Sequence, residues 1–305
     1  MTTPVPHPFS SALGLDAGGT QTRWARADAT GAVRDEGQEP GLSGLQLVSA
    51  AGRAHIGSTL RTIAARAGPV QVVLAGVTGF DAEQQPALRA LVAATFAVDE
   101  ARVHLLSDIE LACRAAFAPG AGHVVYAGTG SIAAHLDAAG TLHRAGGRGV
   151  VIDDAGGGHW IATRALRRIW RAEDKAPGTW RKSPLAQRVF AHIGGSDWAR
   201  TRAWVYGASR GELGTLALAV AGAADEDPAA LALLQAAGGE LARLARALLQ
   251  RCGPLPLALA GRVFELHPAV ENALRGALPA GTSARRLTLP AHHAAARLAA
   301  QRTLP

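Results

Sequence analysis

Leu13-Gly14-Leu15-Asp16-Ala17-Gly18-Gly19-Thr20-Gln21-Thr22 is a short apolar run that ends in an aspartate, paired glycines and hydroxyl side chains. Glycine lacks a Cβ, so backbone N–H groups can approach an anion closely, and a hydroxyl adds a further donor. A second stretch of this type is Val124-Val125-Tyr126-Ala127-Gly128-Thr129-Gly130-Ser131. Two such turns, each on a predicted hairpin, indicate a clamp that holds a polyphosphate from both sides.

The spacing of apolar residues around these turns predicts an α/β chain that repeats its own pattern. Strands are expected at 12–17, 22–27, 32–38, 70–76, 103–106, 124–127, 132–136 and 255–260. Helices are expected at 45–67, from Pro86, and at 109–117, 160–171, 228–251 and 291–302. The strand, glycine turn and strand of the N-terminus recur from Val124, which is typical of a duplicated fold. We place one domain at 1–117 plus 291–305 and the other at 118–290.

Composition favours a globular protein with cores of Ala, Leu and Val, because 48% of the 305 residues are hydrophobic and only 5% are aromatic. The formal net charge is +7, and lysine occurs only at Lys175 and Lys182. The arginines are scattered along predicted helices, with no basic tail and no interleaved aromatic residues. This pattern argues against nucleic acid as a partner, although a basic surface would attract an anionic nucleotide.

Cysteine content and the N-terminus narrow the class further. Cys113 and Cys252 are the only cysteines, and no CxxC occurs, which argues against a disulfide scaffold or a structural zinc cluster. Residues 1–11 do not have the pattern of a secretory signal. No apolar run is long enough to span a membrane. We therefore expect a cytoplasmic protein that does not bind membranes.

The order of these motifs resembles the acetate and sugar kinase, chaperone and actin superfamily. Within it, the chain is most similar to the BadF/BadG/BcrA/BcrD group, which contains N-acetylglucosamine and glucosamine kinases. The resemblance runs from Leu13 to Ala300. It implies two ribonuclease-H-like domains, ATP and Mg²⁺ as cofactors, phosphoryl transfer to a sugar hydroxyl, and a homodimer.

The resemblance assigns two carboxylates to the chemistry. Asp16 matches the aspartate that orients magnesium, a cation that prefers hard oxygen ligands; its alternative is an Asx turn that stabilises the hairpin. Asp108 matches the base that accepts the proton of the attacking hydroxyl. An aspartate between a strand and a helix is also a good N-cap, and capping would fix its carboxylate. Glu110 is a weaker rival for the base.

Further positions follow from the same resemblance. The nucleotide-binding residues are expected to be Gly18, Gly19, Thr20, Gln21, Thr22, Gly128, Thr129, Gly130, Ser131 and Gly261. The substrate-binding residues are expected to be Ser43, Gly147 and Asp154. Asp154 lies in a glycine-rich segment that matches the family's stretch for binding sugar hydroxyls.

Besides Asp153, which falls where the family has glycine, three positions depart from the family pattern. Ala155 replaces a glutamate, and Ser43-Gly44 stands where the sugar-contacting asparagine is expected. His293 replaces a glycine near the expected adenosine pocket. Neighbouring His292 and His293 are expected to point to different sides of a helix, which argues against a metal-binding pair.

Two other functions stay open beside that of a sugar kinase. One is a non-catalytic nucleotide or sugar sensor, motivated by the departures at Gly44, Ala155 and His293. The other is an ATPase that activates a redox enzyme, as some members of this group do with a [4Fe–4S] cluster. The contexts of Cys113 and Cys252 do not favour such a cluster.

Overall fold

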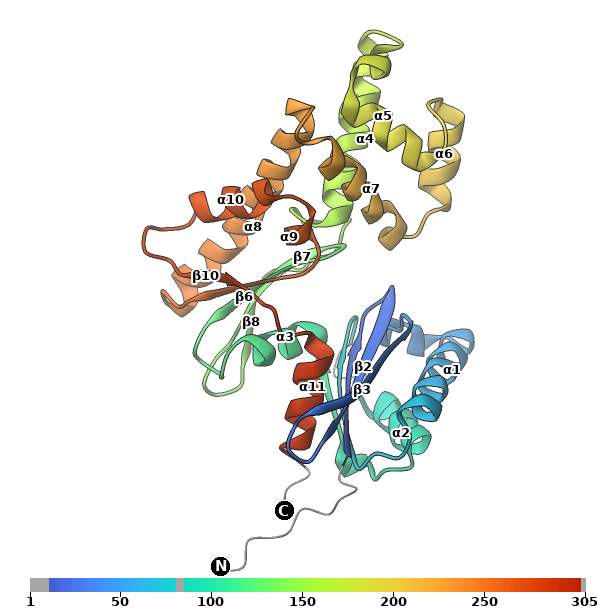
Figure 1. Cartoon of the computed structure of the whole chain (residues 1–305), viewed down its shortest axis with the longest axis vertical. Coiled ribbons are helices and arrows are strands. Elements are labelled where there is room, and N and C mark those ends of the chain that lie inside the picture. The colour runs from blue at the N-terminus through green and yellow to red at the C-terminus, as the bar shows by residue number, and fades with distance from the viewer. Residues whose placement is uncertain (1–10, 81–84, 303–305) are drawn as a thin grey trace, which may run out of the picture. The chain divides into compact units, whose positions relative to one another are not determined.

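The computed structural model describes residues 11–80 and 85–302, which form two compact units (Figure 1). Unit 1 comprises Met1–Ala116 and Thr288–Pro305, and unit 2 comprises Phe117–Leu287. The last helix of the chain, α11 (Ala291–Ala300), therefore packs in unit 1 although it follows unit 2 in the sequence.

Unit 1 is built on a five-stranded sheet in the order β3-β2-β1-β4-β5. Its strands are β1 (Ser11–Ala17), β2 (Gln21–Asp28), β3 (Val33–Pro40), β4 (Val72–Val77) and β5 (Val103–Ser107). The first three are antiparallel, while β1, β4 and β5 are parallel. All six residues of β4 are buried, because a parallel strand in the middle of a sheet is covered on both faces.

Helices cover both faces of this sheet (Figure 1). They are α1 (Ala50–Ala67), α2 (Gln85–Phe96), α3 (Asp108–Ala116) and α11, with 3₁₀ turns η1 (Gly44–Val48) and η2 (Glu100–Arg102). Leu13 and Leu15 face the core formed with α1 and α2, while Ala12 faces the core formed with α3 and α11. Gly14 lets α11 lie directly on β1, since a Cβ there would be 2.0 Å from the Ala296 nitrogen.

Unit 2 repeats the topology with a sheet in the order β10-β9-β6-β7-β8. Its strands are β6 (His123–Ala127), β7 (Ser131–Leu136), β8 (Leu142–Gly146), β9 (Leu257–Ala260) and β10 (Ala284–Arg286). As in unit 1, three antiparallel strands are extended by two parallel ones. The predicted duplicated α/β fold is confirmed by these two sheets.

The helices of unit 2 make the larger core. They are α4 (Gly158–Lys175), η3 (Thr179–Lys182), α5 (Pro184–Ile193), α6 (Trp198–Gly207), α7 (Arg210–Ala223), α8 (Pro228–Cys252), α9 (Val263–Leu266) and α10 (Pro268–Gly276). Asp227 caps α8 and Pro228 occupies its first turn, which fixes where this long helix begins. None of the helices in the described residues has the length and hydropathy needed to cross a bilayer.

Two sequence predictions of secondary structure need correction. The helix expected at 45–67 is interrupted at Ser49, whose backbone is extended and whose side chain accepts a hydrogen bond from Gly52. Helices α5, α6, α7, α9 and α10 and strands β8 and β10 were not predicted. Thr201 is the sole buried residue of α6, and exposed Leu218 blurs the apolar stripe of α7, so neither helix shows a clear period.

Candidate functional site

Asp16 and Asp108 lie at the same edge of the unit 1 sheet. Asp16 is level with Gly76 of β4, which is level with Leu106 of β5, and Asp108 follows at the start of α3. Burial raises the pKa of Asp16 to about 6, and the negative charge of Asp108 adds to the rise while Arg23 opposes it. The carboxyl ends of parallel strands thus bring together the two carboxylates that the sequence singled out.

The helix after β5 leaves the Asp108 carboxylate available. The Glu110 amide donates to the Ser107 hydroxyl at 3.3 Å, so Ser107 is the side chain that caps α3. Asp108 accepts a bond only from the amide of the next residue, at 2.8 Å, within the described part of the chain. The expected N-cap role of Asp108 is therefore wrong. Glu110, the rival base, forms an ion pair with Arg114 at 2.8 Å.

The first glycine turn closes a tight hairpin between β1 and β2. The Gly18 amide donates to the Gln21 carbonyl at 3.0 Å. A Cβ at Gly19 would meet nothing within 4 Å, and its φ is not in the left-handed region. Neither packing nor backbone conformation therefore requires glycine at Gly19, whereas a ligand that approaches the backbone would.

The other predicted residues of this turn differ in accessibility. Thr20 is exposed at the tip. The Gln21 side chain bonds to Gln38 and Arg23 along the sheet. Thr22 is fully buried, and its hydroxyl has no partner among residues 11–80 and 85–302. In this conformation Thr22 is shielded from any ligand at the hairpin tip.

Ser43, which the sequence predicted to contact the substrate, has a structural role in unit 1. Its hydroxyl donates to the Thr78 carbonyl at 3.1 Å and accepts from the Leu45 amide at 3.3 Å. With Gln46 it forms a capping box at the start of η1. The single hydroxyl proton of Ser43 is thus already donated within unit 1.

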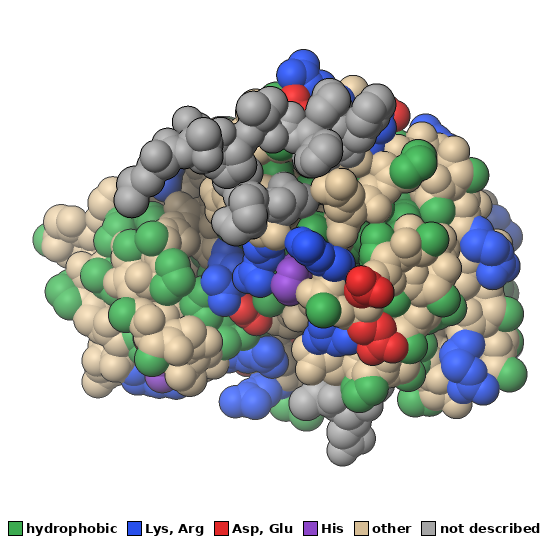
Figure 2. All heavy atoms as spheres, turned by 90° about the horizontal axis from the view of Figure 1, so that it is seen from below, with side chains coloured by type: hydrophobic (Ala, Val, Ile, Leu, Met, Phe, Trp, Pro, Cys, Tyr) green, Lys and Arg blue, Asp and Glu red, His purple; other side chains and the backbone are tan. Residues whose placement is uncertain are grey.

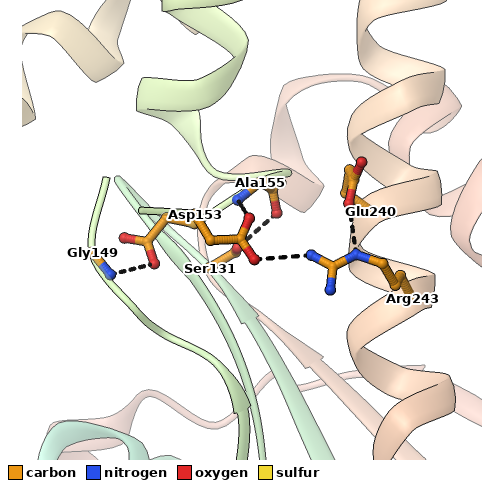
Figure 3. A network of polar contacts seen from close by, with 7 residues as sticks. Ser131, Gly149, Asp153, Ala155, Glu240 and Arg243 are labelled. Atoms are coloured by element: carbon orange, nitrogen blue, oxygen red, sulfur yellow. Dashed lines mark hydrogen bonds and ion pairs between the residues drawn. The ribbon is translucent and has the colours of Figure 1, made fainter. Parts of the chain in front are cut away.

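In unit 2 the second glycine turn is held by the glycine segment that leads into α4. The Gly158 amide donates to the Gly128 carbonyl at 2.8 Å, and the His159 amide donates to the Thr129 carbonyl at 3.0 Å. The buried Ser131 hydroxyl donates to the Ala155 carbonyl at 2.7 Å (Figure 3). The Thr129 hydroxyl makes no hydrogen bond to any described residue and can donate to a ligand, unlike the Ser131 hydroxyl.

Asp153 and Asp154 have different environments. Asp153 is paired with Arg243 at 3.1 Å, and Arg243 also contacts Glu240 (Figure 3). Asp154 has a left-handed backbone (φ 63°) and accepts from the Gly149 amide at 3.1 Å. Burial raises its pKa. Asp153 therefore anchors the segment to α8, while Asp154 forms no ion pair with any residue that the structure describes.

The remaining predicted residues of unit 2 lie at the same sheet edge. A Cβ at Gly130 would be 2.3 Å from the Asp154 carboxylate. Gly147 donates its amide to the Ser131 carbonyl at 3.0 Å. Gly261 has φ 98°, and a Cβ there would be 2.3 Å from the Ala127 carbonyl oxygen. The fold thus gathers Gly261, Gly147 and Asp154 around the turn at Gly128–Ser131.

Arg210 is a charged neighbour that the sequence analysis missed. It is the first residue of α7, and its positive charge acts on the pKa values of both Asp154 and His159. The capping box of Ser209 and Glu212 marks a helix start. No local sequence pattern, however, predicts that this helix start lies near Asp154 and His159.

The three departures from the family pattern have local packing roles. The side chain of Ala155 is buried, and the buried Gly44 donates its amide to the Thr78 carbonyl at 3.0 Å. His293 lies in unit 1 against Glu36 of β3. The expected divergence of His292 and His293 is wrong, since their ring centroids are 4.5 Å apart and both rings approach Glu36.

The surface charges and the two cysteines have the following positions in the fold. On the face drawn in Figure 2, Lys and Arg side chains occur at several places with acidic groups between some of them. Cys113 is buried in α3, and Cys252 is the last residue of α8.

Solved structures share this fold over nearly the whole chain. A candidate N-acetylglucosamine kinase from Chromobacterium violaceum is 28% identical, with TM-score 0.70 and coverage of 97% of this chain and 99% of that one. A candidate N-acetylglucosamine kinase from Porphyromonas gingivalis is 16% identical, with TM-score 0.72 and coverage of 97% and 100%. A ROK family glucokinase from Streptomyces griseus, in complex with glucose and AMPPNP, is 14% identical, with TM-score 0.62 and coverage of 96% and 99%.

None of the curated proteins matches the chain. The model of the BadF/BadG/BcrA/BcrD ATPase family matches residues 13–278, a span that includes both glycine turns, Asp16, Asp108 and Asp154. With this match and the duplicated fold, the protein belongs to the BadF/BadG/BcrA/BcrD ATPase family.

Proposed function

We propose that this protein is an ATP-dependent kinase that transfers the γ-phosphoryl group of ATP to a sugar hydroxyl. The observation that carries the proposal is the edge of the unit 1 sheet, where Asp16 and Asp108 lie at the ends of parallel strands beside an open glycine hairpin. The family match and the names of the similar structures support a nucleotide and a sugar as ligands.

Asp108 is proposed as the base. Its carboxylate would accept the proton of the sugar hydroxyl while that oxygen forms a bond to the γ-phosphorus. The bond between the γ-phosphorus and the bridging oxygen breaks, and ADP leaves with both electrons of that bond. Because Ser107 caps the helix, Asp108 can serve as base without loss of the α3 start.

Asp16 is proposed to hold Mg²⁺, either directly or through a bound water molecule. The residues present fit this ion, since a partly buried carboxylate beside a second carboxylate is a hard, electronegative environment. When bound, Mg²⁺ supplies positive charge that neutralises the phosphates of ATP. Without a cation, burial and Asp108 keep the pKa of Asp16 high, so protons compete for this site near pH 6.

A second group of proposed binding residues lies within unit 2. The backbone around Gly128–Gly130 and the unpaired Thr129 hydroxyl would bind phosphate oxygens. Gly261 would leave room for the adenosine. Asp154 would accept hydrogen bonds from sugar hydroxyls, because its carboxylate forms no ion pair within residues 11–80 and 85–302 and accepts from the Gly149 amide.

An amino sugar, N-acetylglucosamine or glucosamine, is our proposed acceptor. It is supported by the names of the Chromobacterium violaceum and Porphyromonas gingivalis proteins, the first of which is 28% identical to this chain.

The test is ADP release from Mg²⁺-ATP with a panel of hexoses and amino sugars. In Asp108→Asn, we expect sugar-stimulated turnover to fall by about 10²–10⁴-fold, the range of general-base effects, with nearly unchanged ATP affinity. Glu110→Gln is the matched control, since it removes a carboxylate two residues away on the same helix and should retain most activity.

Two results would contradict the proposal. Turnover in Asp108→Asn equal to that of the unaltered protein would exclude this base. ATP and sugar binding without ADP release by the unaltered protein would favour a sensor instead.

A further inference from the structure

Outside the proposed kinase site, unit 1 brings together two histidines and a carboxylate from opposite ends of the chain. Glu36 lies on the edge strand β3, level with Ala25 of β2. His292 and His293 lie in the first turn of α11. The close packing of α11 on β1 at Gly14 holds that turn over the edge of the sheet.

The three side chains converge on one point. His293 Nε2 contacts Glu36 Oε2, and His292 Nε2 lies 3.5 Å from the same oxygen. One nitrogen or oxygen atom from each of the three residues lies within 4.8 Å of the others. In a tetrahedral zinc site with bonds of about 2.0–2.1 Å, neighbouring ligand atoms are roughly 3.4 Å apart. The Glu36 side chain is 57% exposed and free to move by the small amount that such a geometry needs.

We propose that Glu36, His292 and His293 form a binding site for a divalent transition-metal ion of the zinc class. Two imidazoles and one carboxylate are a donor set that suits zinc, and three protein ligands leave a position for water. Such an ion would tie the edge strand β3 to the start of α11. This inference does not depend on the kinase proposal.

The environment of His292 favours a metal over a simple ion pair. The side chain is about nine-tenths buried, at 7% residue exposure, and its Nδ1 has no hydrogen-bond partner within the described residues. Its Nε2 is farther from Glu36 than in a normal hydrogen bond.

Nearby charges set the selectivity of the site. Glu36 supplies the one negative charge of the donor set, and Arg23 adds a positive charge that acts on His292. A hard cation such as Mg²⁺, which prefers several oxygen ligands, should therefore bind poorly. Imidazole donors retain affinity for zinc in the presence of excess Mg²⁺.

The direct test is titration of the tag-free full chain with ZnCl₂ by isothermal calorimetry, in buffer that contains excess MgCl₂. We expect one Zn²⁺ per chain. Glu36→Gln and His293→Asn should each raise the Kd by roughly tenfold or more, since each removes one ligand. His192→Asn is the matched control, because His192 is an exposed helical histidine in unit 2.

Hydrogen exchange gives a second readout that does not involve activity. Zn²⁺ should slow exchange in the peptides that contain β3 and α11, and this protection should disappear in Glu36→Gln. Failure of the unaltered protein to bind Zn²⁺ would overturn the proposal. Binding that is equal in Glu36→Gln, His293→Asn and the unaltered protein would do so as well, by placing the ion elsewhere.

Discussion

Asp16→Asn should stabilise unit 1 at neutral pH. The pKa of Asp16 is about 6 in the folded protein, compared with 3.8 for an aspartate in an unperturbed environment. At about 1.4 kcal/mol per pKa unit, this difference corresponds to a cost of about 3 kcal/mol for ionised Asp16 in the folded state. Because Asp16 is partly exposed, a gain of about 2–3 kcal/mol is expected when asparagine removes the charge.

The direction of the Asp16 pKa shift sets the pH range in which this residue changes the free energy of unfolding. The folded state binds the Asp16 proton more tightly than the unfolded chain, so the free energy of unfolding falls as pH rises from about 4 to 6. The gain from Asp16→Asn should therefore be full at pH 7.5 and absent near pH 3.8. Asp108→Asn removes only the second cause of the shift and should recover a smaller part of the gain at pH 7.5.

The assay must report on unit 1 alone, since a chain of two units need not unfold in one step. Urea unfolding followed by pulsed hydrogen exchange in the peptides of β1 and β4 meets this need. The control is Asp99→Asn, which removes an exposed carboxylate that makes no capping bond. Equal urea midpoints for Asp16→Asn and the unaltered protein at pH 7.5, without Mg²⁺, would refute the inference that burial and the Asp108 charge raise the pKa of Asp16.

The remaining predictions concern local packing. Gly239→Ala should stabilise α8 by about 0.5–1 kcal/mol, because a Cβ there meets nothing within 4 Å. Gly238→Ala should destabilise α8, because a Cβ there would lie 2.2 Å from the Val270 carbonyl oxygen of α10. Melting temperatures that shift in the same direction for both variants would contradict this. Gly130→Ala should displace Asp154 and raise the KM for sugar more than that for ATP; equal increases would argue against separate roles. Asp227→Ala should lower the free energy of unfolding in urea by about 1–3 kcal/mol, since Asp227 accepts hydrogen bonds from two backbone amides and a hydroxyl. A decrease of less than about 0.5 kcal/mol would contradict that role.

Much of the scaffold could be predicted from sequence because its signals are local. A dense apolar run such as Val72–Val77 indicates a buried strand wherever it occurs. The repeated strand, glycine turn and strand at Leu13 and Val124 predicted the duplication. Asp16 and Asp108 were singled out by the resemblance of their motifs to a known family, and the structure places Asp16 near the end of β1 and Asp108 directly after β5.

The roles of individual polar side chains were less predictable, because they depend on which neighbour is closest. Asp108 follows a strand and precedes a helix, yet Ser107 is the residue that caps α3. Ser43 matched a substrate position, yet its hydroxyl is bonded to Thr78, a residue on the far side of α1 in the sequence. No local pattern distinguishes these outcomes.

The sequence by itself determined the class of fold and its duplication, because strands, turns and helix starts are set by short-range periodicity and backbone preference. Tertiary structure alone decided that Arg210 lies near Asp154, and that His292 and His293 meet Glu36. These residues come from segments far apart in the chain. Their proximity is fixed by the packing of whole helices on sheets, as where Gly14 admits α11, and a single local sequence carries no record of that packing.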